Sequence, residues 1–244
     1  FGKARRSRAI DEQEKTIVAW HEAGHAIVQA LQKDYEPLHK VSIIARGRTG
    51  GASFTLPEKD RVVYPMKYWL AYLRICYGGR VAEELFCGDA STGASMDIQQ
   101  ATGIARSMVR DWGMNDRVGF IFYGEDDSKP SMGFGEPREY SEETAGVIDE
   151  EVKKLIDAMQ VETKQMLEAH RAQIEAVAQA LLKYETIDGN DVDRIMRGDT
   201  LTKPTIPDLL DKEHRRGNTV QPTAPPEKAP NIIPGFGGPM PSPG

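Results

Sequence analysis

Trp20-His21-Glu22-Ala23-Gly24-His25-Ala26 lies in the middle of a run whose apolar residues recur at helical intervals. Such spacing predicts an amphipathic helix with one face turned toward the protein core. The helix is expected to open at Asp11, because Asp11 and Glu14 have the separation of a capping box, and to end before Pro37.

Two histidines four residues apart fall on the same helical face, so His21 and His25 can bind one metal ion. Glu22 projects beside them, where its carboxylate can accept a proton from a water molecule on that ion. Gly24 costs about 1 kcal/mol relative to Ala inside a helix, which indicates close packing against another element. This H-E-x-x-H arrangement is typical of zinc peptidases, whose metal has three protein ligands and one open position.

The third ligand must come from elsewhere in the chain, and Asp97 is our first candidate. It falls in the first turn of an expected helix, four and eight residues before Ala101 and Ala105, and therefore on the apolar side. A carboxylate facing a core needs a cation or full hydrogen bonding, and a zinc ion would supply the charge. The alternative for Asp97 is ordinary capping of the helix N-terminus.

Glu83 and Glu84 are rival candidates, because they lie near the end of the preceding expected helix. Glu84 shares that helix's apolar stripe, whereas a salt bridge with Arg80 would give either residue a purely structural role. The remaining histidines have no partner at ligand spacing and are expected to be surface or structural residues: His39, His170 and His214.

The rest of the chain predicts a mainly α fold with a few short strands. Strands are expected at residues 41–45 and 52–56, with a turn at 47–51 and a possible further strand at 118–123. Further helices are expected at 65–86, with an interruption at Gly78-Gly79, and at 95–112 and 190–196. Residues 124–139 are rich in Gly, Pro, Asp and Ser and are expected to form a mobile loop.

Ser141 is expected to cap a long helical region that reaches Lys183 and bends or breaks near His170. Its apolar spacing is not a sustained heptad, so an antiparallel helical hairpin packed on itself is expected rather than a coiled coil. Beyond residue 197 the chain holds most of its 15 prolines and ends in Gly/Pro repeats, which predicts a disordered tail at 198–244.

Composition limits the partners and the compartment that can be expected for this chain. The 244 residues carry a formal net charge of −6, so no general attraction to nucleic acid is expected, and the basic residues before residue 10 are interpreted as linker. The two cysteines form no disulfide framework, which favours a reducing compartment. Because no run of about 18 apolar residues occurs, the chain as given is expected to be soluble. It begins at Phe1 rather than Met, so we expect a piece of a longer protein.

The chain resembles the peptidase domain of the FtsH family of ATP-dependent zinc metalloproteases, which are AAA+ membrane proteases. The resemblance covers roughly residues 3–197 and keeps the family's order and spacing. The stretches that carry it are W-H-E-A-G-H-A at 20–26, H-K-V-S-I-I at 39–44, Y-G-G-R-V-A-E-E-L at 77–85, S-T-G-A-S-M-D-I at 91–98, D-W-G-M at 111–114, Y-S-E-E-T-A at 140–145 and E-T-I-D-G at 185–189.

The resemblance implies a role for each matching residue. His21 and His25 match the family's zinc-binding histidines, Glu22 its catalytic glutamate, and Asp97 its third zinc ligand, with one Zn²⁺ per chain. Glu84 then becomes a candidate for orienting a ligand histidine. Met96, next to Asp97, stands where relatives often carry a polar residue.

The resemblance also implies an organisation. Residues 1–10 would be a connector after an ATPase domain, 11–197 the helical zinc metallopeptidase domain, and 198–244 the tail. The full-length protein would be a homo-hexamer anchored in a bacterial inner membrane or in a mitochondrial or chloroplast membrane. ATP and Mg²⁺ would act only through the ATPase domain, because this chain has no G-x-x-x-x-G-K-[ST] phosphate loop.

Three hypotheses follow for function. The first is an endopeptidase that degrades unfolded or membrane proteins, with a substrate strand aligned along Gly51, Ala52, Ser53, Phe54, Thr55 and Leu56 by backbone pairing. An ordinary hairpin strand is the alternative for that segment. The second hypothesis is a catalytically silent domain with structural zinc that serves assembly or interaction. The third is a zinc hydrolase of small substrates.

Overall fold

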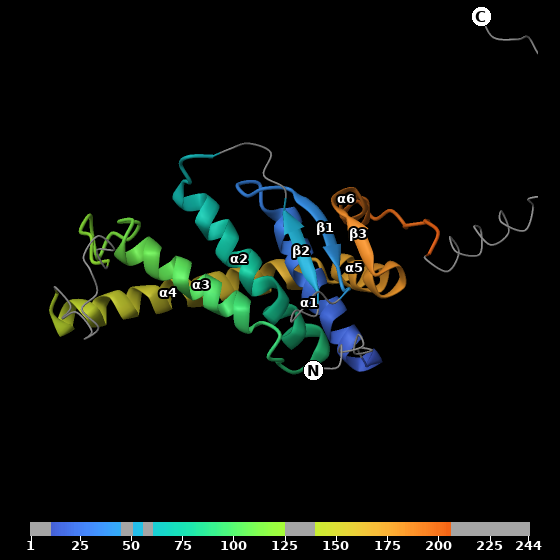
Figure 1. Cartoon of the computed structure of the whole chain (residues 1–244), viewed down its shortest axis with the longest axis horizontal. Coiled ribbons are helices and arrows are strands. Elements are labelled where there is room, and N and C mark those ends of the chain that lie inside the picture. The colour runs from blue at the N-terminus through green and yellow to red at the C-terminus, as the bar shows by residue number, and fades with distance from the viewer. Residues whose placement is uncertain (1–10, 45–50, 56–60, 125–139, 206–244) are drawn as a thin grey trace, which may run out of the picture. The chain divides into compact units, whose positions relative to one another are not determined.

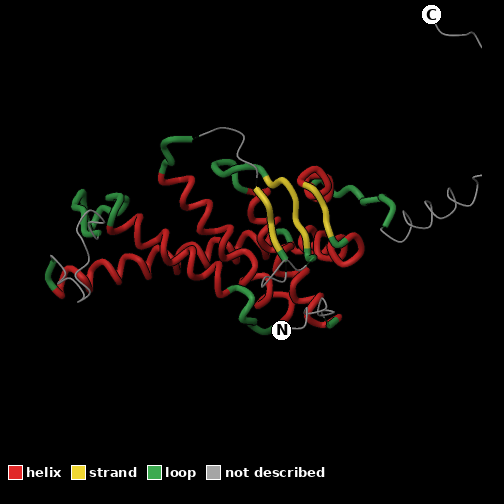
Figure 2. Tube along the Cα trace, in the orientation of Figure 1, coloured by secondary structure: helices red, strands yellow, loops and turns green. Residues whose placement is uncertain are grey.

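A computed structural model describes residues 11–44, 51–55, 61–124 and 140–205 of the chain. Contacts divide the chain into one compact unit, Phe1–Lys203, and a second segment, Pro204–Gly244. The described part of the first unit is mainly helical with one small sheet, as expected (Figure 1, Figure 2). The expected loop at 124–139 lies almost entirely outside the described residues, as do the connector at 1–10 and all but residues 198–205 of the tail expected at 198–244.

Helix α1 (Glu12–Leu31) begins directly after Asp11, as predicted, and it is the central element of the unit. The capping-box expectation for Asp11 and Glu14 is wrong, because the Asp11 side chain caps no backbone N–H. The second half of the helix is buried from Glu22 to Gln29, so its metal-binding histidine candidates stand on a helix enclosed by other elements.

Three strands form an antiparallel sheet in the order β2-β1-β3. They are β1 (Leu38–Ser42), β2 (Ala52–Thr55) and β3 (Thr186–Asp188). Strand β1 begins and ends three residues before the expected range 41–45, and β3 was not expected, since three residues are too few to show a period. Val41 of β1 is opposite Ser53 on one side and Ile187 on the other. Strand β2 therefore forms an edge of the sheet.

Helix α2 (Met66–Ala82) crosses α1 at very short range and runs on into a π-helical turn, η1 (Glu83–Cys87). The expected interruption at Gly78-Gly79 is wrong, because the helix passes through both glycines. They serve packing instead: a Cβ added to Gly24 would lie 2.3 Å from the carbonyl oxygen of Gly78. Only glycines allow the two backbones to approach so closely.

Helix α3 (Ser95–Arg110) follows η1 and a short loop and packs on α2. Its buried side is formed by Ala101, Ala105, Met108 and Val109, which is the apolar side expected from the sequence. Residues 118–123 were expected as a possible strand, but they form an irregular segment.

Helices α4 (Glu142–Ala169) and α5 (Arg171–Tyr184) are separated at His170, where the backbone leaves helical geometry. Ser141 caps α4 as predicted, since its hydroxyl accepts a hydrogen bond from the Thr144 N–H. The expectation of a hairpin packed on itself is wrong. Helix α4 packs mainly on α2 and α3, α5 packs on α1, and α5 leads away from α4 instead of folding back along it (Figure 1).

The short helix α6 (Gly189–Met196) closes the unit, with a capping box formed by Asp188 and Asp191. The chain then stays attached to α5 and α6. The Tyr184 hydroxyl donates to the Leu201 carbonyl at 3.1 Å, and Lys203 pairs with Asp191. Residues up to Lys203 are thus part of the compact unit, and the domain boundary expected at residue 197 stays a prediction.

Two further properties concern the described residues as a whole. Cys76 and Cys87 are both free thiols, in agreement with the absence of a disulfide framework. Within the described ranges, every helix is too short or too polar to cross a lipid bilayer.

Candidate metal centre

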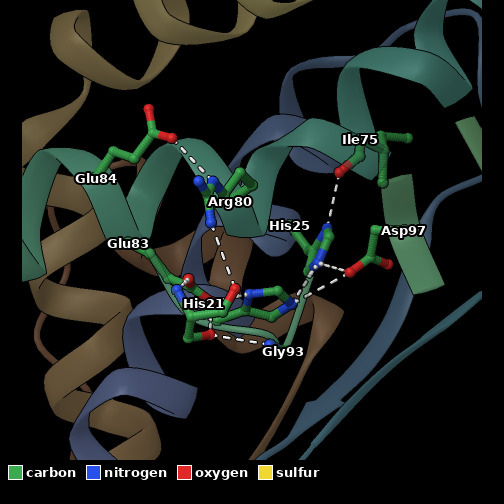
Figure 3. Close-up of polar contacts among 9 residues, drawn as sticks. His21, His25, Ile75, Arg80, Glu83, Glu84, Gly93 and Asp97 are labelled. Atoms are coloured by element: carbon green, nitrogen blue, oxygen red, sulfur yellow. Dashed lines mark hydrogen bonds and ion pairs between the residues drawn. The ribbon is translucent and has the colours of Figure 1, made fainter. Parts of the chain in front are cut away.

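Three side chains from two helices converge at one point (Figure 3). The Nε2 atoms of His21 and His25, on α1, lie 3.0 Å apart. Oδ2 of Asp97, in the first turn of α3, lies 3.4 Å from the first and 3.6 Å from the second. Tetrahedral zinc with bonds of about 2.0–2.1 Å separates its ligand atoms by about 3.3 Å. The observed spacings bracket that value.

The contacts of the two Nδ1 atoms determine whether the Nε2 atoms carry a hydrogen or a lone pair. His25 Nδ1 lies 2.7 Å from the carbonyl oxygen of Ile75, which accepts only, so the Nδ1 atom bears the hydrogen. His21 Nδ1 likewise faces a carboxylate oxygen of Glu83 at 2.7 Å. In the neutral rings both Nε2 atoms are therefore acceptors, and together with Asp97 they bring three lone pairs to one place. Acceptors crowded in this way repel one another unless a cation or a proton lies between them, so the donor set fits a divalent metal.

The charges of the site lead to the same conclusion. Burial lowers the pKa of His21, but hydrogen bonds with Asp97 and Glu83 outweigh it and raise the pKa to about 9. Burial raises the pKa of Asp97, yet its hydrogen bonds with His21 and His25 dominate and hold the pKa well below the usual range. Without a metal, a proton on His21 takes the place of the cation.

Glu22 lies next to the centre on the side of the sheet. Its side chain is 5% exposed, and Oε2 accepts a hydrogen bond of 3.0 Å from the Ser53 hydroxyl on β2. Burial raises the pKa of Glu22, while His25 and His21 act in the opposite direction. A buried carboxylate beside a candidate metal position is suitably placed to exchange protons there.

Glu83, not Glu84, is the glutamate that contacts a histidine of the centre. Glu83 is 1% exposed, and besides His21 it accepts hydrogen bonds from the N–H and the hydroxyl of Ser91, at 2.8 and 2.9 Å. Glu84 points away and forms a salt bridge of 2.8 Å with Arg80 (Figure 3). The orienting role expected for Glu84 is therefore wrong, and the salt bridge that the sequence left open is what forms.

Gly79 is a further site residue that the sequence reasoning missed. A Cβ added there would lie 2.5 Å from both His21 Cε1 and His25 Nε2, so the backbone of α2 forms the wall behind the two rings. Glu83 follows four residues later and shares that face of the helix. The adjacent glycines Gly78 and Gly79 could have predicted this role, because paired glycines in a helix indicate that another element approaches the backbone closely.

The segment expected to align a substrate, residues 51–56, lies partly within the described residues. Strand β2 places Ser53 against Glu22, and a Cβ on the preceding Gly51 would lie 2.6 Å from Glu22 Oε1. Thr55 accepts a hydrogen bond from Gln29 on α1. Leu56 lies outside the described residues, as do the side chains of Ala52 and Phe54. The role of this segment in binding a substrate remains a prediction.

Two histidines four residues apart on a helix, a distant carboxylate and a neighbouring buried glutamate are the donor set and base of metallopeptidases of the H-E-x-x-H class. The model of Peptidase family M41 matches residues 8–195. The chain belongs to this family.

Several proteins named as FtsH proteases are similar in sequence to this chain. The chain is 44% identical to ATP-dependent zinc metalloprotease FtsH 2 of Methylacidiphilum infernorum, over 84% of this chain and 32% of the relative. It is 44% identical to ATP-dependent zinc metalloprotease FtsH of Chlamydia trachomatis, over 80% of this chain and 22% of the relative. The protein of the same name from Rhodococcus erythropolis is 42% identical, over 81% and 23%. The chain thus spans about a quarter to a third of the length of these relatives.

Proposed function

We propose that this chain is a zinc-dependent endopeptidase in which His21, His25 and Asp97 bind one zinc ion and Glu22 is the general base. The observation that carries the proposal is the convergence of three acceptor atoms, all within 4.8 Å of one another, beside a buried glutamate. Membership of family M41 and the names of the relatives support the same function.

The chemistry divides between the metal and the chain. When bound, a zinc ion with three protein ligands lowers the pKa of a coordinated water to about 7 and polarises a carbonyl group. Glu22 accepts a proton from the attacking water and delivers it to the amine nitrogen as the peptide C–N bond breaks. Glu83 and the Ile75 carbonyl hold the two imidazole rings through their Nδ1–H groups, so that both Nε2 atoms stay available.

Strand β2 is our candidate for substrate alignment. It is one of the two edge strands of the sheet, and among the described residues its outer side has no partner strand. An extended peptide could add there by main-chain hydrogen bonds, directly beside the strand whose Ser53 contacts Glu22. Recognition of the backbone would favour unfolded protein substrates over folded ones.

A structural-zinc assembly domain is the alternative function, and the geometry gives it little support. Structural zinc sites have four protein ligands. Among the described residues, only His21, His25 and Asp97 form a group with metal-ligand spacing. Glu22 is also buried beside the group, where a structural site would need no base.

The proposal extends to the full-length protein. The relatives are named ATP-dependent, and we propose that this chain is the proteolytic part of a membrane-anchored protease of unfolded and membrane proteins. ATP and Mg²⁺ would act through an ATPase domain outside these 244 residues.

A homo-hexamer is proposed for that full-length protein, and an exposed apolar surface supports contact between copies. We call this surface the apolar patch; its members are Val62, Val63, Tyr64, Trp112, Phe120, Ile121 and Phe122. Trp69 joins its two halves, with ring centroids 5.5 Å from Tyr64 and 4.9 Å from Trp112. Apolar patches of this kind commonly mark protein–protein contacts.

The test combines metal analysis with a cleavage assay on casein, which is already unfolded and needs no ATP-driven unfolding. The parent chain should retain about one zinc per chain and cleave casein. Glu22→Gln should retain zinc and lose cleavage, whereas Asp97→Ala should lose both. Glu84→Gln is the matched control, since Glu84 is exposed and outside the centre.

Each result is decisive. Casein cleavage by Glu22→Gln at the parental rate would refute the general-base role. Full zinc occupancy in Asp97→Ala would refute the ligand assignment. Cleavage of a dipeptide panel without cleavage of casein would indicate a hydrolase of small substrates instead.

A further inference from the structure

The carboxylate of Glu22 rests against one side of strand β2. Its Oε2 accepts the hydroxyl hydrogen of Ser53 at 3.0 Å. Its Oε1 and Cγ lie beside the Gly51 backbone, where an added Cβ would come within 2.6 and 2.9 Å. Gly51 and Ser53 are two residues apart, so they face the same side of the extended chain. The edge strand thus encloses the carboxylate with a hydroxyl on one oxygen and bare backbone beside the other.

Ser53 is the one hydrogen-bond partner of the Glu22 carboxylate in the part of the chain that the structure describes. Glu22 is 5% exposed, so bulk water has little access to hold its carboxylate in one orientation. A glutamate carboxylate turns easily about its terminal torsion, which is broad and roughly two-fold. The Ser53 hydroxyl therefore determines how the two oxygens are directed.

We propose that Ser53 is a positioning residue for Glu22: it engages Oε2 and leaves Oε1 free to exchange the proton. This inference rests on the proposed function, in which Glu22 is the general base. It also adds a coupling, because the strand that would pair with the substrate backbone is the strand that orients the base. A substrate that shifts β2 would shift Glu22 with it.

The test compares four variants of the full chain on an internally quenched peptide: Ser53→Ala, Ser53→Thr, Ser42→Ala and Glu22→Gln. The values of kcat and KM are measured separately. Ser53→Ala should lower kcat about tenfold, the effect expected for losing a hydrogen bond to a charged group. KM should stay within about twofold, because the Ser53 side chain faces Glu22 and not the outer edge of the strand. Ser53→Thr keeps the hydroxyl and should restore most of kcat.

Ser42→Ala is the matched control for effects on the sheet. Ser42 lies in the neighbouring strand β1, where its hydroxyl contacts the Thr186 hydroxyl at 2.8 Å, the Glu185 carbonyl and the Ile44 N–H, and it pairs across the sheet with Ala52 and not with Ser53. Its loss removes a buried hydroxyl from the same sheet without changing the base. The kcat of Ser42→Ala should therefore remain close to that of the parent.

The outcomes separate this inference from the proposed function. If Glu22→Gln is inactive while Ser53→Ala keeps its kcat, Glu22 is essential and the positioning role of Ser53 is wrong. Equal losses of kcat in Ser53→Ala and Ser53→Thr, or in Ser53→Ala and Ser42→Ala, would also overturn it. A change confined to KM would assign Ser53 to substrate binding instead. An active Glu22→Gln would overturn the proposed function itself.

Discussion

Replacement of Glu83 by Gln tests the support of the candidate metal centre, because the neighbouring Glu84 offers a built-in control. Glu83 uses both carboxylate oxygens. Oε1 accepts from His21 Nδ1 at 2.7 Å and from the Ser91 hydroxyl at 2.9 Å, and Oε2 accepts from the Ser91 N–H at 2.8 Å. Glutamine keeps the shape of the side chain but turns one of these oxygens into an NH₂ group, which cannot accept.

The expected loss of zinc affinity in Glu83→Gln follows from these hydrogen bonds. In either amide orientation one N–H group, on His21 or on Ser91, faces another donor in a site where Glu83 is 1% exposed. Loss of a residue that orients a metal-bound histidine typically weakens metal binding about 10- to 100-fold, or about 1.4–2.7 kcal/mol. We expect that loss for Glu83→Gln. Glu84→Gln removes only an exposed pair with Arg80, so its zinc affinity should remain within about twofold of the parent.

The assay is a competition for zinc between each variant and a chromophoric chelator, followed by casein cleavage across a range of free zinc. Glu83→Gln should need more zinc for half-maximal cleavage, and added zinc should restore most of the activity. The reasoning is refuted if Glu83→Gln binds zinc as tightly as the parent, or if Glu84→Gln loses affinity to the same extent. The second result would return the orienting role to Glu84.

Three further predictions address protonation, packing and assembly. The pKa of His21 is raised from 6.5 to about 9 in the metal-free protein, so this histidine carries a proton at pH 7 that zinc must displace. Calorimetry in buffers of different ionisation enthalpy should detect release of about one proton per zinc from His21 at pH 7, in addition to any proton lost by the zinc-bound water, and no release at pH 7 would contradict the assignment. The same raised pKa stabilises the metal-free fold below pH 6.5, and this contribution is lost as the pH rises through about 9. Among the described residues, the Tyr77 hydroxyl is buried without a hydrogen-bond partner, so Tyr77→Phe should leave the free energy of unfolding in urea unchanged or raise it by about 1 kcal/mol; a clear loss of stability would reveal a partner. Phe120 is 98% exposed, so Phe120→Ser should not destabilise the monomer but should weaken self-association in sedimentation velocity, whereas Val161→Ser on α4, which lies outside the apolar patch, should not. Unchanged association of Phe120→Ser would remove the apolar patch from the proposed interface.

Local sequence patterns were sufficient to predict most of the helices. Helices α1 and α3 begin where predicted, and Ser141 caps α4, because each start depends on a few adjacent residues. Strand β3 could not be foreseen from three residues, since its pairing partner β1 lies far away in sequence. The direction of α5 also could not be predicted from the sequence. It depends on the surface that α1 offers, and amphipathic helices can bury their apolar faces on many different partners.

The sequence by itself placed two imidazoles on one face of a helix, because a spacing of four residues nearly completes a helical turn. It also put Asp97 on the apolar side of α3, and the resemblance to a family named it as the third ligand. Only the tertiary structure distinguished Glu83 from Glu84. Adjacent residues on a helix point about 100° apart, and the crossing of α1 over Gly78 and Gly79 determines which of the two directions leads to His21. Contacts between distant segments settle such a choice, and no local pattern contains them.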